Sequence, residues 1–214
     1  MSTVPFPSSQ QYETGYYSLF ARGVDPAELL LKVSKNPGRP ILLDRSEAEA
    51  IKIFGIDIDG EDVPGLDLDE LQASGILEDD RPLLRAGSHG GWSFVIESEG
   101  PYLGQERILE VASIGTIAFS AGLTEVQAGW ISYAEDGQIL SSFDPLFPEQ
   151  DYGKNPLIFE GVTEYREAIL SGQRHEAYEN AFRQIQRKLR CIIPQEVDAH
   201  RLLSVRAAGR AFEE

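Results

Sequence analysis

The sequence predicts an α+β fold: an antiparallel sheet of hairpin and meander strands, helices packed on one side of it, and a helical C-terminal extension. The strongest observation is the pair Asp136 and Gly137, which lies between two alternating, β-prone runs and is typical of a hairpin turn. Residues 92–97 alternate aromatic and aliphatic with polar side chains, which indicates a strand. Residues 173–190 repeat apolar side chains at helical spacing, which predicts an amphipathic helix.

The N-terminal region predicts a tail, a strand and a helix. Residues 1–11 are rich in Pro, Ser and Gln, and we expect them to form a flexible tail. Residues 16–21 are rich in aromatic side chains, which favours a strand. Asp25 and Pro26 suit the N-cap and the first turn of a helix. Residues 12–150 together form the main α+β domain in this interpretation.

The next region is dominated by acidic residues. Residues 39–43 predict a short strand, and Ser46 with Glu49 has the spacing of a capping box for a helix over 46–54. Residues 44–80 contain thirteen Asp and Glu against two Lys and Arg, which leaves a net charge of −11. We expect the acidic insert, residues 56–80, to be surface loop and short helix.

The predicted sheet has four strands, which begin at Trp92, Ile114, Trp130 and Gln138. A glycine-rich turn at 88–91 precedes the first of them, a helix over 105–112 precedes the second, and a turn at Gly122 follows the second. Residues 151–214 form the helical C-terminal extension, with helices at 161–171, 173–190 and 198–211.

The composition limits the classes of partner and compartment. A net charge of −16 repels nucleic acids and anionic membranes and attracts basic surfaces, so we expect no nucleic acid or membrane partner. Apolar runs are shorter than a membrane span needs, and the first residues lack the pattern of a secretory signal. The single cysteine, Cys191, allows no intramolecular disulfide. We therefore expect a cytoplasmic protein.

No motif for catalysis, metal or cofactor binding is recognisable. Asp57, Asp59 and Asp62 could offer oxygen ligands to calcium, but the EF-hand register fails because Asp62 stands where the loop needs glycine. The three histidines are far apart in the sequence and form no ligand pair. Nucleophile-elbow, Walker A and G-x-G-x-x-G patterns are missing. We therefore predict no catalytic residues, no metal and no cofactor.

Two runs in the second half of the domain resemble a known signature. Residues 132–137 read SYAEDG and residues 142–148 read SFDPLFP. These runs resemble a domain family of unknown function that is common in actinobacteria. The resemblance covers residues 16–150, and the acidic stretch 57–80 is longer than its pattern. It implies a small α/β domain and an actinobacterial source, and it supplies no catalytic residues.

The leading hypothesis is a non-enzymatic, cytoplasmic protein-binding module with a basic partner. An inhibitor or immunity-type protein that covers a basic toxin or nuclease is one concrete version. The candidate partner-binding residues are hairpin residues without a role in turn geometry, and acids of the insert. They are Glu135, Phe143, Phe147, Asp57, Asp59 and Asp62.

Two alternatives belong to other functional classes. The first is an enzyme, or a biosynthetic accessory protein, whose polar pocket is assembled from residues distant in sequence. Candidates for such a pocket are His89, Glu97, Asp136 and Asp144. The second is a structural or assembly protein that forms a homo-oligomer through a sheet edge or the C-terminal helices.

Overall fold

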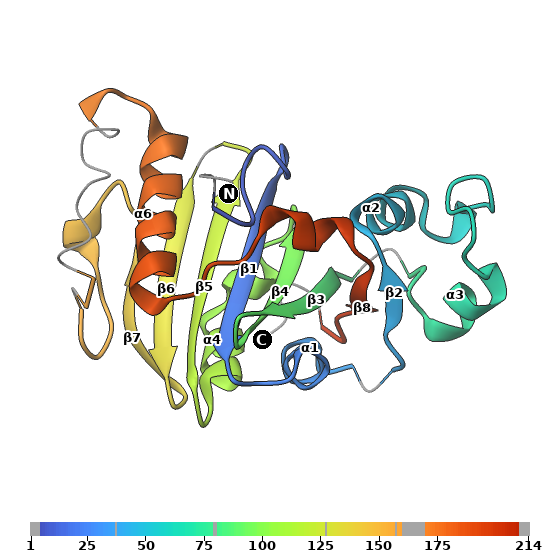
Figure 1. Cartoon of the computed structure of the whole chain (residues 1–214), viewed down its shortest axis with the longest axis horizontal. Helices are drawn as coiled ribbons and strands as arrows, with labels where there is room; N and C mark the ends of the chain where they lie inside the picture. The colour runs from blue at the N-terminus through green and yellow to red at the C-terminus, as the bar shows by residue number, and fades with distance from the viewer. Residues whose placement is uncertain are drawn as a thin grey trace.

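The computed structural model describes residues 5–36, 38–78, 81–126, 128–156, 158–159 and 170–209. They form one eight-stranded sheet in the order β2-β8-β3-β4-β1-β5-β6-β7 (Figure 1), and its paired strands are antiparallel. The predicted α+β fold is therefore confirmed. The strands are β1 (Gly15–Arg22), β2 (Ile41–Leu43), β3 (Leu83–His89), β4 (Trp92–Ser98), β5 (Ile117–Thr124), β6 (Gly129–Glu135), β7 (Gln138–Phe143) and β8 (Leu202–Arg206).

The predicted hairpin and meander are present. Asp136 and Gly137 connect β6 to β7 with positive φ angles of 48° and 76°, the conformation that a primed two-residue turn requires. β5, β6 and β7 form a meander, and β1 separates it from β4. The predicted turn at Gly122 is wrong, because this glycine pairs with Tyr17 and Trp130 inside β5. The pattern also failed to predict β3, which occupies the supposed turn at 88–89.

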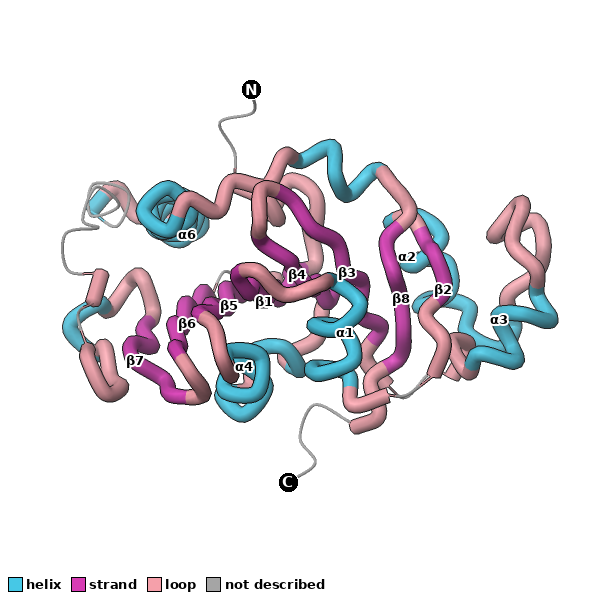
Figure 2. The backbone as a smooth tube through the Cα atoms, turned by 60° about the horizontal axis from the view of Figure 1, so that its bottom comes forward, coloured by secondary structure: helices cyan, strands magenta, loops and turns pink. Residues whose placement is uncertain are grey.

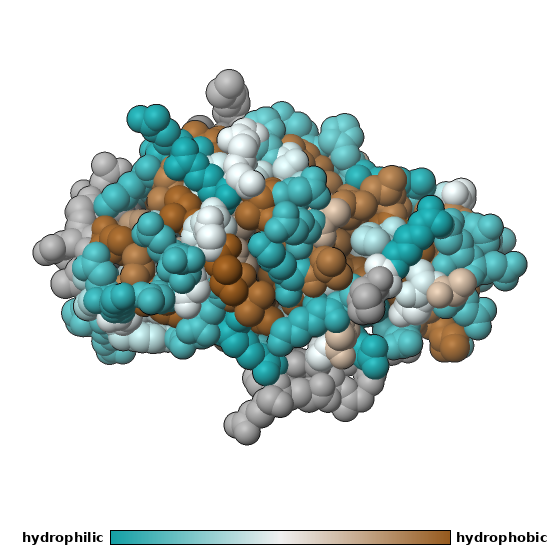
Figure 3. Space-filling view, turned by 90° about the horizontal axis from the view of Figure 1, so that it is seen from below, coloured by the Kyte–Doolittle hydropathy of each residue, from teal (hydrophilic) through white to brown (hydrophobic). Residues whose placement is uncertain are grey.

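Helices cover both faces of the sheet (Figure 2). α1 (Pro26–Ser34) and α4 (Glu106–Ser113) share an aliphatic core with one face. α6 (Arg174–Leu189), the predicted helix of the C-terminal extension, packs on the opposite face. That core is aromatic, and the rings of Phe20 and Phe119 stack within it at 4.5 Å between centroids. Seen from below, apolar side chains form an interrupted band between hydrophilic surfaces (Figure 3).

Caps determine where the first two helices begin. Asp25 is the N-cap of α1, as predicted, and its carboxylate accepts hydrogen bonds from backbone N–H groups of the first turn. α2 (Arg45–Phe54) has a capping box, but Asp44 and Glu47 form it rather than Ser46 and Glu49. Asp44 prevails because its carboxylate accepts from the Glu47 N–H at 2.9 Å while the Glu47 carboxylate accepts from the Asp44 N–H at 2.8 Å.

The acidic insert is a folded lobe with its own small core. A 3₁₀ turn (Gly55–Asp57) and α3 (Leu68–Ser74) follow α2. Apolar side chains of this segment pack with residues of β2, α2 and β3 as a third hydrophobic cluster. Residues 56–78, called the acidic lobe below, therefore combine an apolar interior with a charged exterior.

The C-terminal extension is only partly helical. The predicted helix over 198–211 is wrong, because a 3₁₀ turn (Gln195–Ala199) leads into β8. β8 pairs with β2 on one side and β3 on the other, and neighbouring side chains Leu202 and Leu203 pack into the cores of opposite faces. The sequence predicts a helix here because five residues alternate too briefly to be recognised as a strand. The predicted helix over 161–171 lies almost entirely outside the described residues.

The start of the described chain is not a flexible tail. Phe6 is only 1% exposed, its ring packs edge-on against Phe94 at 5.4 Å, and its carbonyl accepts a hydrogen bond from the Gln186 amide at 3.0 Å. The prediction is therefore wrong for residues 5–11, because one aromatic side chain in a Pro/Ser-rich segment suffices to fix it to the core.

Candidate functional site

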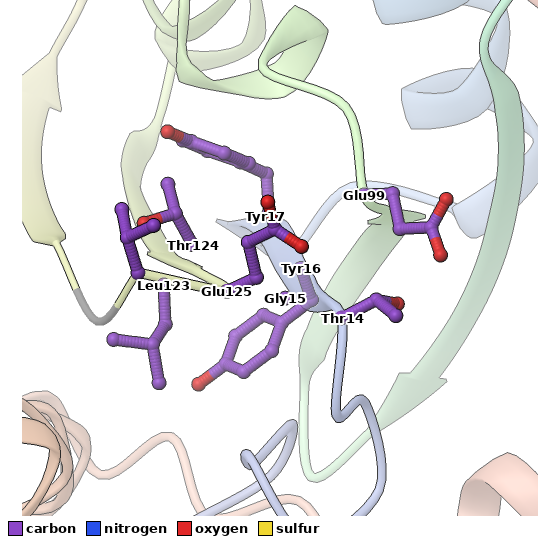
Figure 4. A pocket seen from close by; sticks show the side chains of 9 residues that line it. Thr14, Gly15, Tyr16, Tyr17, Glu99, Leu123, Thr124 and Glu125 are labelled. Atoms are coloured by element: carbon purple, nitrogen blue, oxygen red, sulfur yellow. The ribbon is translucent and has the colours of Figure 1, made fainter.

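A groove of about 450 Å³ lies where β1 begins and β5 ends. Residues 14–17, Glu99 and residues 123–126 line it. Figure 4 shows Glu99 on one side of Gly15 and the residues of β5 on the other. This arrangement follows from the pairing, since Gly15 is opposite Thr124 and its carbonyl accepts from the Glu99 N–H at 3.2 Å.

Glycine is required at the floor of the groove. Gly15 has a φ of +99°, and a Cβ at this position would lie 2.6 Å from the Leu123 carbonyl oxygen. Any side chain would push β1 away from β5. The floor is therefore bare backbone, and the neighbouring Tyr16 points to the aromatic core, where its hydroxyl donates to the Pro7 carbonyl at 2.9 Å.

Tyr17 forms a rigid wall of the groove. Its ring lies against two glycines, because a Cβ at Gly104 or Gly122 would come within 2.5 Å or 2.3 Å of ring carbons. The ring is half-buried, and burial, with a smaller contribution from Glu97, raises the pKa of the Tyr17 hydroxyl. Tyr17 therefore presents a neutral aromatic side chain in a fixed position.

Glu97 lies beside Tyr17 on β4 and is 2% exposed. Its carboxylate accepts hydrogen bonds from the backbone N–H groups of Leu103 at 2.8 Å and Tyr102 at 3.3 Å. Burial raises the pKa of the Glu97 carboxyl to about 7, although these two donors and Lys52 act in the opposite direction. Glu97 thus fixes the 3₁₀ turn (Tyr102–Gly104) whose last residue covers Tyr17.

Glu99 forms the charged rim of the groove in an unusual backbone conformation. Its φ is +68°, a region that costs energy for a residue with a side chain. Its carboxylate is 2.8 Å from the Lys52 ammonium of α2, and the hydrogen bond from Lys52 lowers the pKa of Glu99. Lys52 also donates to Ser98 Oγ at 3.1 Å. α2 is therefore fixed to one side of the groove.

A buried ionic cluster lies at Arg85 of β3, on the face of the sheet opposite to Glu97. Arg85 and Asp198 form an ion pair of 2.7 Å with both side chains nearly inaccessible. The Tyr12 hydroxyl donates to Asp198 at 3.0 Å, and burial, followed by the Asp198 charge, raises the Tyr12 pKa. Arg45 adds a second positive charge at 3.5 Å from Asp198. This cluster joins the C-terminal segment to β3 and leaves little room for a ligand, because the adjoining cavity holds about 10 Å³.

The end of α2 and the acidic lobe together present a second surface of distinct chemistry. Ile53 and Ile56 are each 70% exposed and Phe54 is 44% exposed, although all three are large apolar side chains. We call these three residues the α2 apolar patch. Asp57 follows it directly in the chain, and Asp57, Asp59 and most other acids of the lobe are solvent-exposed. Ion pairs between described residues reach only Glu70 and Glu78 within the lobe, so most of this charge is not neutralised.

The predicted partner-binding residues do not form one surface. Asp57, Asp59 and Asp62 belong to the acidic lobe. Glu135 is exposed at the end of β6, a strand that lies across the sheet from α2 and α3 (Figure 1). Phe147 is partly exposed after β7. Phe143 is 4% exposed and packs in the aromatic core. It offers no area to a partner, so that part of the prediction is wrong.

The four residues of the alternative polar pocket are also separated. His89 and Glu97 lie at opposite ends of the β3–β4 hairpin. His89 pairs with Trp92 next to the turn, and Glu97 pairs with Leu84 at the other end. Asp136 holds the β6–β7 turn by accepting from the Gly115 N–H at 3.1 Å. Asp144 accepts from the Leu146 N–H after β7. The prediction of a pocket shared by these four residues is therefore wrong.

Sequence patterns gave little sign of the groove. Tyr16 and Tyr17 stand out as aromatic, but the contacts that fix Tyr17 come from Gly104 and Gly122, far away in the chain. The described residues contain no cluster of three or more side chains suited to a metal. Within the same residues, no helix has the length and hydropathy to cross a membrane. Cys191 is a free, buried thiol.

The fold and the groove define an antiparallel α+β domain with a groove lined by Tyr17 and two carboxylates, and with an acidic lobe. The chain belongs to a family of unknown function, DUF6461, whose model matches residues 7–169. The predicted relation to a family of unknown function is thereby confirmed. No curated protein and no solved structure matches the chain.

Proposed function

We propose that the protein is a non-enzymatic, cytoplasmic protein-binding module that holds a basic partner through its acidic lobe. An inhibitor or immunity-type protein is the concrete form of this proposal. The observation that carries it is the α2 apolar patch beside exposed, unneutralised acids. Protein interfaces combine an apolar centre with a polar rim, and this surface has both parts.

Charge complementarity selects the partner's chemistry. The protein has a net charge of −16, and residues 56–80 contain ten acidic residues without any Lys or Arg. Such a field accelerates association with a positively charged surface and makes it sensitive to salt. The exposed Ile53, Phe54 and Ile56 then supply apolar area, which is less sensitive to salt.

The test is quantitative capture of partners from the native lysate at low and high salt. The charge variant is Asp57→Asn/Asp59→Asn/Asp62→Asn, because asparagine keeps the acceptor oxygens with which Asp59 and Asp62 hold the local loop. The patch variant is Ile53→Ser/Ile56→Ser. We expect each variant to bind a basic partner about tenfold more weakly, or weaker still, than the wild type does.

Matched controls change the same chemistry elsewhere. Glu28→Gln/Glu110→Gln/Glu149→Gln removes three exposed charges outside the lobe, and Ile192→Ser removes an exposed apolar side chain near the C-terminus. The controls should bind like the wild type. Capture of partners that are not basic, or equal losses in the control variants, contradicts the proposal.

A further inference from the structure

The groove at the start of β1 also carries a negative charge. Glu99 and Glu125 line it, and none of its lining residues is Lys, Arg or His. Lys52 reaches the Glu99 carboxylate from α2, whereas no ion pair to Glu125 occurs among the described residues. The groove is therefore suited to a cation.

The lining of the groove favours a planar cation on an apolar stem. Tyr17 offers a half-buried aromatic ring that lies against Gly104 and Gly122, and guanidinium groups stack on such rings more readily than ammonium groups do. Val126 is an exposed aliphatic residue of the lining. The groove volume of about 450 Å³ falls in the range of sites that enclose a small ligand or a long side chain.

Acceptors for several guanidinium N–H groups line the same groove. A guanidinium has five donors in a fixed plane, and the lining supplies hydroxyl oxygens at Thr14 and Thr124 besides the two carboxylates. The backbone is held at Gly15, which pairs with Thr124, and at Glu99, whose N–H donates to the Gly15 carbonyl at 3.2 Å. Such constraint reduces the ordering cost of binding.

We infer that this groove binds an arginine side chain of the basic partner. The inference rests on the proposed function for the partner's identity, and it adds a second contact site outside the acidic lobe. The guanidinium stacks on Tyr17 and donates to Glu125, which lies next to Tyr17 in Figure 4, and the aliphatic stem lies along Val126.

The test uses acetyl-arginine-methylamide as the probe, titrated into the full-length, ¹⁵N-labelled protein. Acetyl-citrulline-methylamide is the matched control, because citrulline has almost the same shape without the charge. We expect the arginine probe to shift the backbone amide signals of residues 14–17, Glu99 and 123–126 with a Kd of the order of millimolar. The citrulline probe should leave them unchanged.

Glu125→Gln tests the charge at a position exposed enough to spare the fold. We expect the arginine probe to bind about two- to fivefold more weakly to this variant, whereas Glu110→Gln on α4 should bind it like the wild type. Equal shifts with both probes, shifts confined to the acidic lobe, or unchanged affinity in Glu125→Gln would overturn the inference.

Failure of the groove and failure of the proposed function give different results. If the captured partner loses affinity with the lobe variants but not with Glu125→Gln, the protein-binding proposal stands and the groove inference is wrong. If the arginine probe binds the groove and no basic partner is captured, the groove is a cation site and the proposed function is wrong.

Discussion

Replacement of Glu97 by glutamine should change how stability depends on pH. Burial raises the folded-state pKa of this carboxyl from 4.5 to about 7. The folded state therefore holds this proton more tightly than the unfolded state does. The resulting stabilisation is fully present below about pH 4.5 and is lost as the pH rises through 7.

The expected magnitude follows from the two pKa values. A single group with pKa values of 4.5 unfolded and about 7 folded makes the free energy of unfolding about 2.5 kcal/mol lower at pH 8 than at pH 5. Other carboxyls act in the opposite sense, because the pKa values of Asp44 and Glu99 are lowered in the folded state. The wild-type value minus the Glu97→Gln value isolates the Glu97 contribution.

The measurement is urea unfolding of both proteins at pH 5, 6, 7 and 8. The Glu97→Gln variant keeps the size of the side chain and one acceptor for the Leu103 N–H, and its loss of the second acceptor adds an offset of about 1 kcal/mol that does not depend on pH. Glu110→Gln, at an exposed position of α4, is the control. A difference between wild type and Glu97→Gln that stays constant within about 0.5 kcal/mol from pH 5 to pH 8 refutes this reasoning.

Three further predictions follow from the packing. Gly122→Ala places a methyl group 2.3 Å from the Tyr17 ring and should lower the free energy of unfolding by about 1–3 kcal/mol. Gly60→Ala, where the space is open, should change the free energy of unfolding little. Equal denaturation midpoints for the two variants would contradict this. Arg85→Met should cost about 3–5 kcal/mol because it leaves Asp198 buried without its main partner, and Arg85→Met/Asp198→Leu should recover much of that loss in a double-mutant cycle. Truncation after residue 169 removes α6 and β8 and should abolish the cooperative unfolding transition seen by circular dichroism; a cooperative, monomeric product would show that the remaining residues fold alone.

Local patterns predicted elements whose determinants are close in sequence. The turn at Asp136 and Gly137, the cap at Asp25 and the long apolar stripe of α6 each depend on a few neighbouring residues, and all three are present. The sequence does not predict β8, because five residues are too few for a period to separate a strand from a helix. Its strand conformation comes from pairing with β2 and β3, which no local pattern contains.

The groove was missed for the same physical reason. Its wall depends on Tyr17 meeting Gly104 and Gly122, and its floor depends on the approach of Gly15 to β5. In a sequence, a glycine usually indicates a turn or a break in an element. Only the register of the sheet shows that these glycines make room for the Tyr17 ring and for the close approach of β1 to β5. Glu97 was recognised as a polar candidate, but its role in holding the turn beside Tyr17 depends on burial.

The C-terminal segment is part of the same fold as the residues that the family model matches. The match ends at residue 169, yet α6 contributes Tyr178 and Phe182 to the aromatic core and Asp198 neutralises Arg85. β2, which leads into α2 and the acidic lobe, pairs with β8. The position of the lobe relative to the groove therefore depends on a strand from beyond the matched region. A protein that uses both surfaces for one partner needs this strand to fix the distance between them.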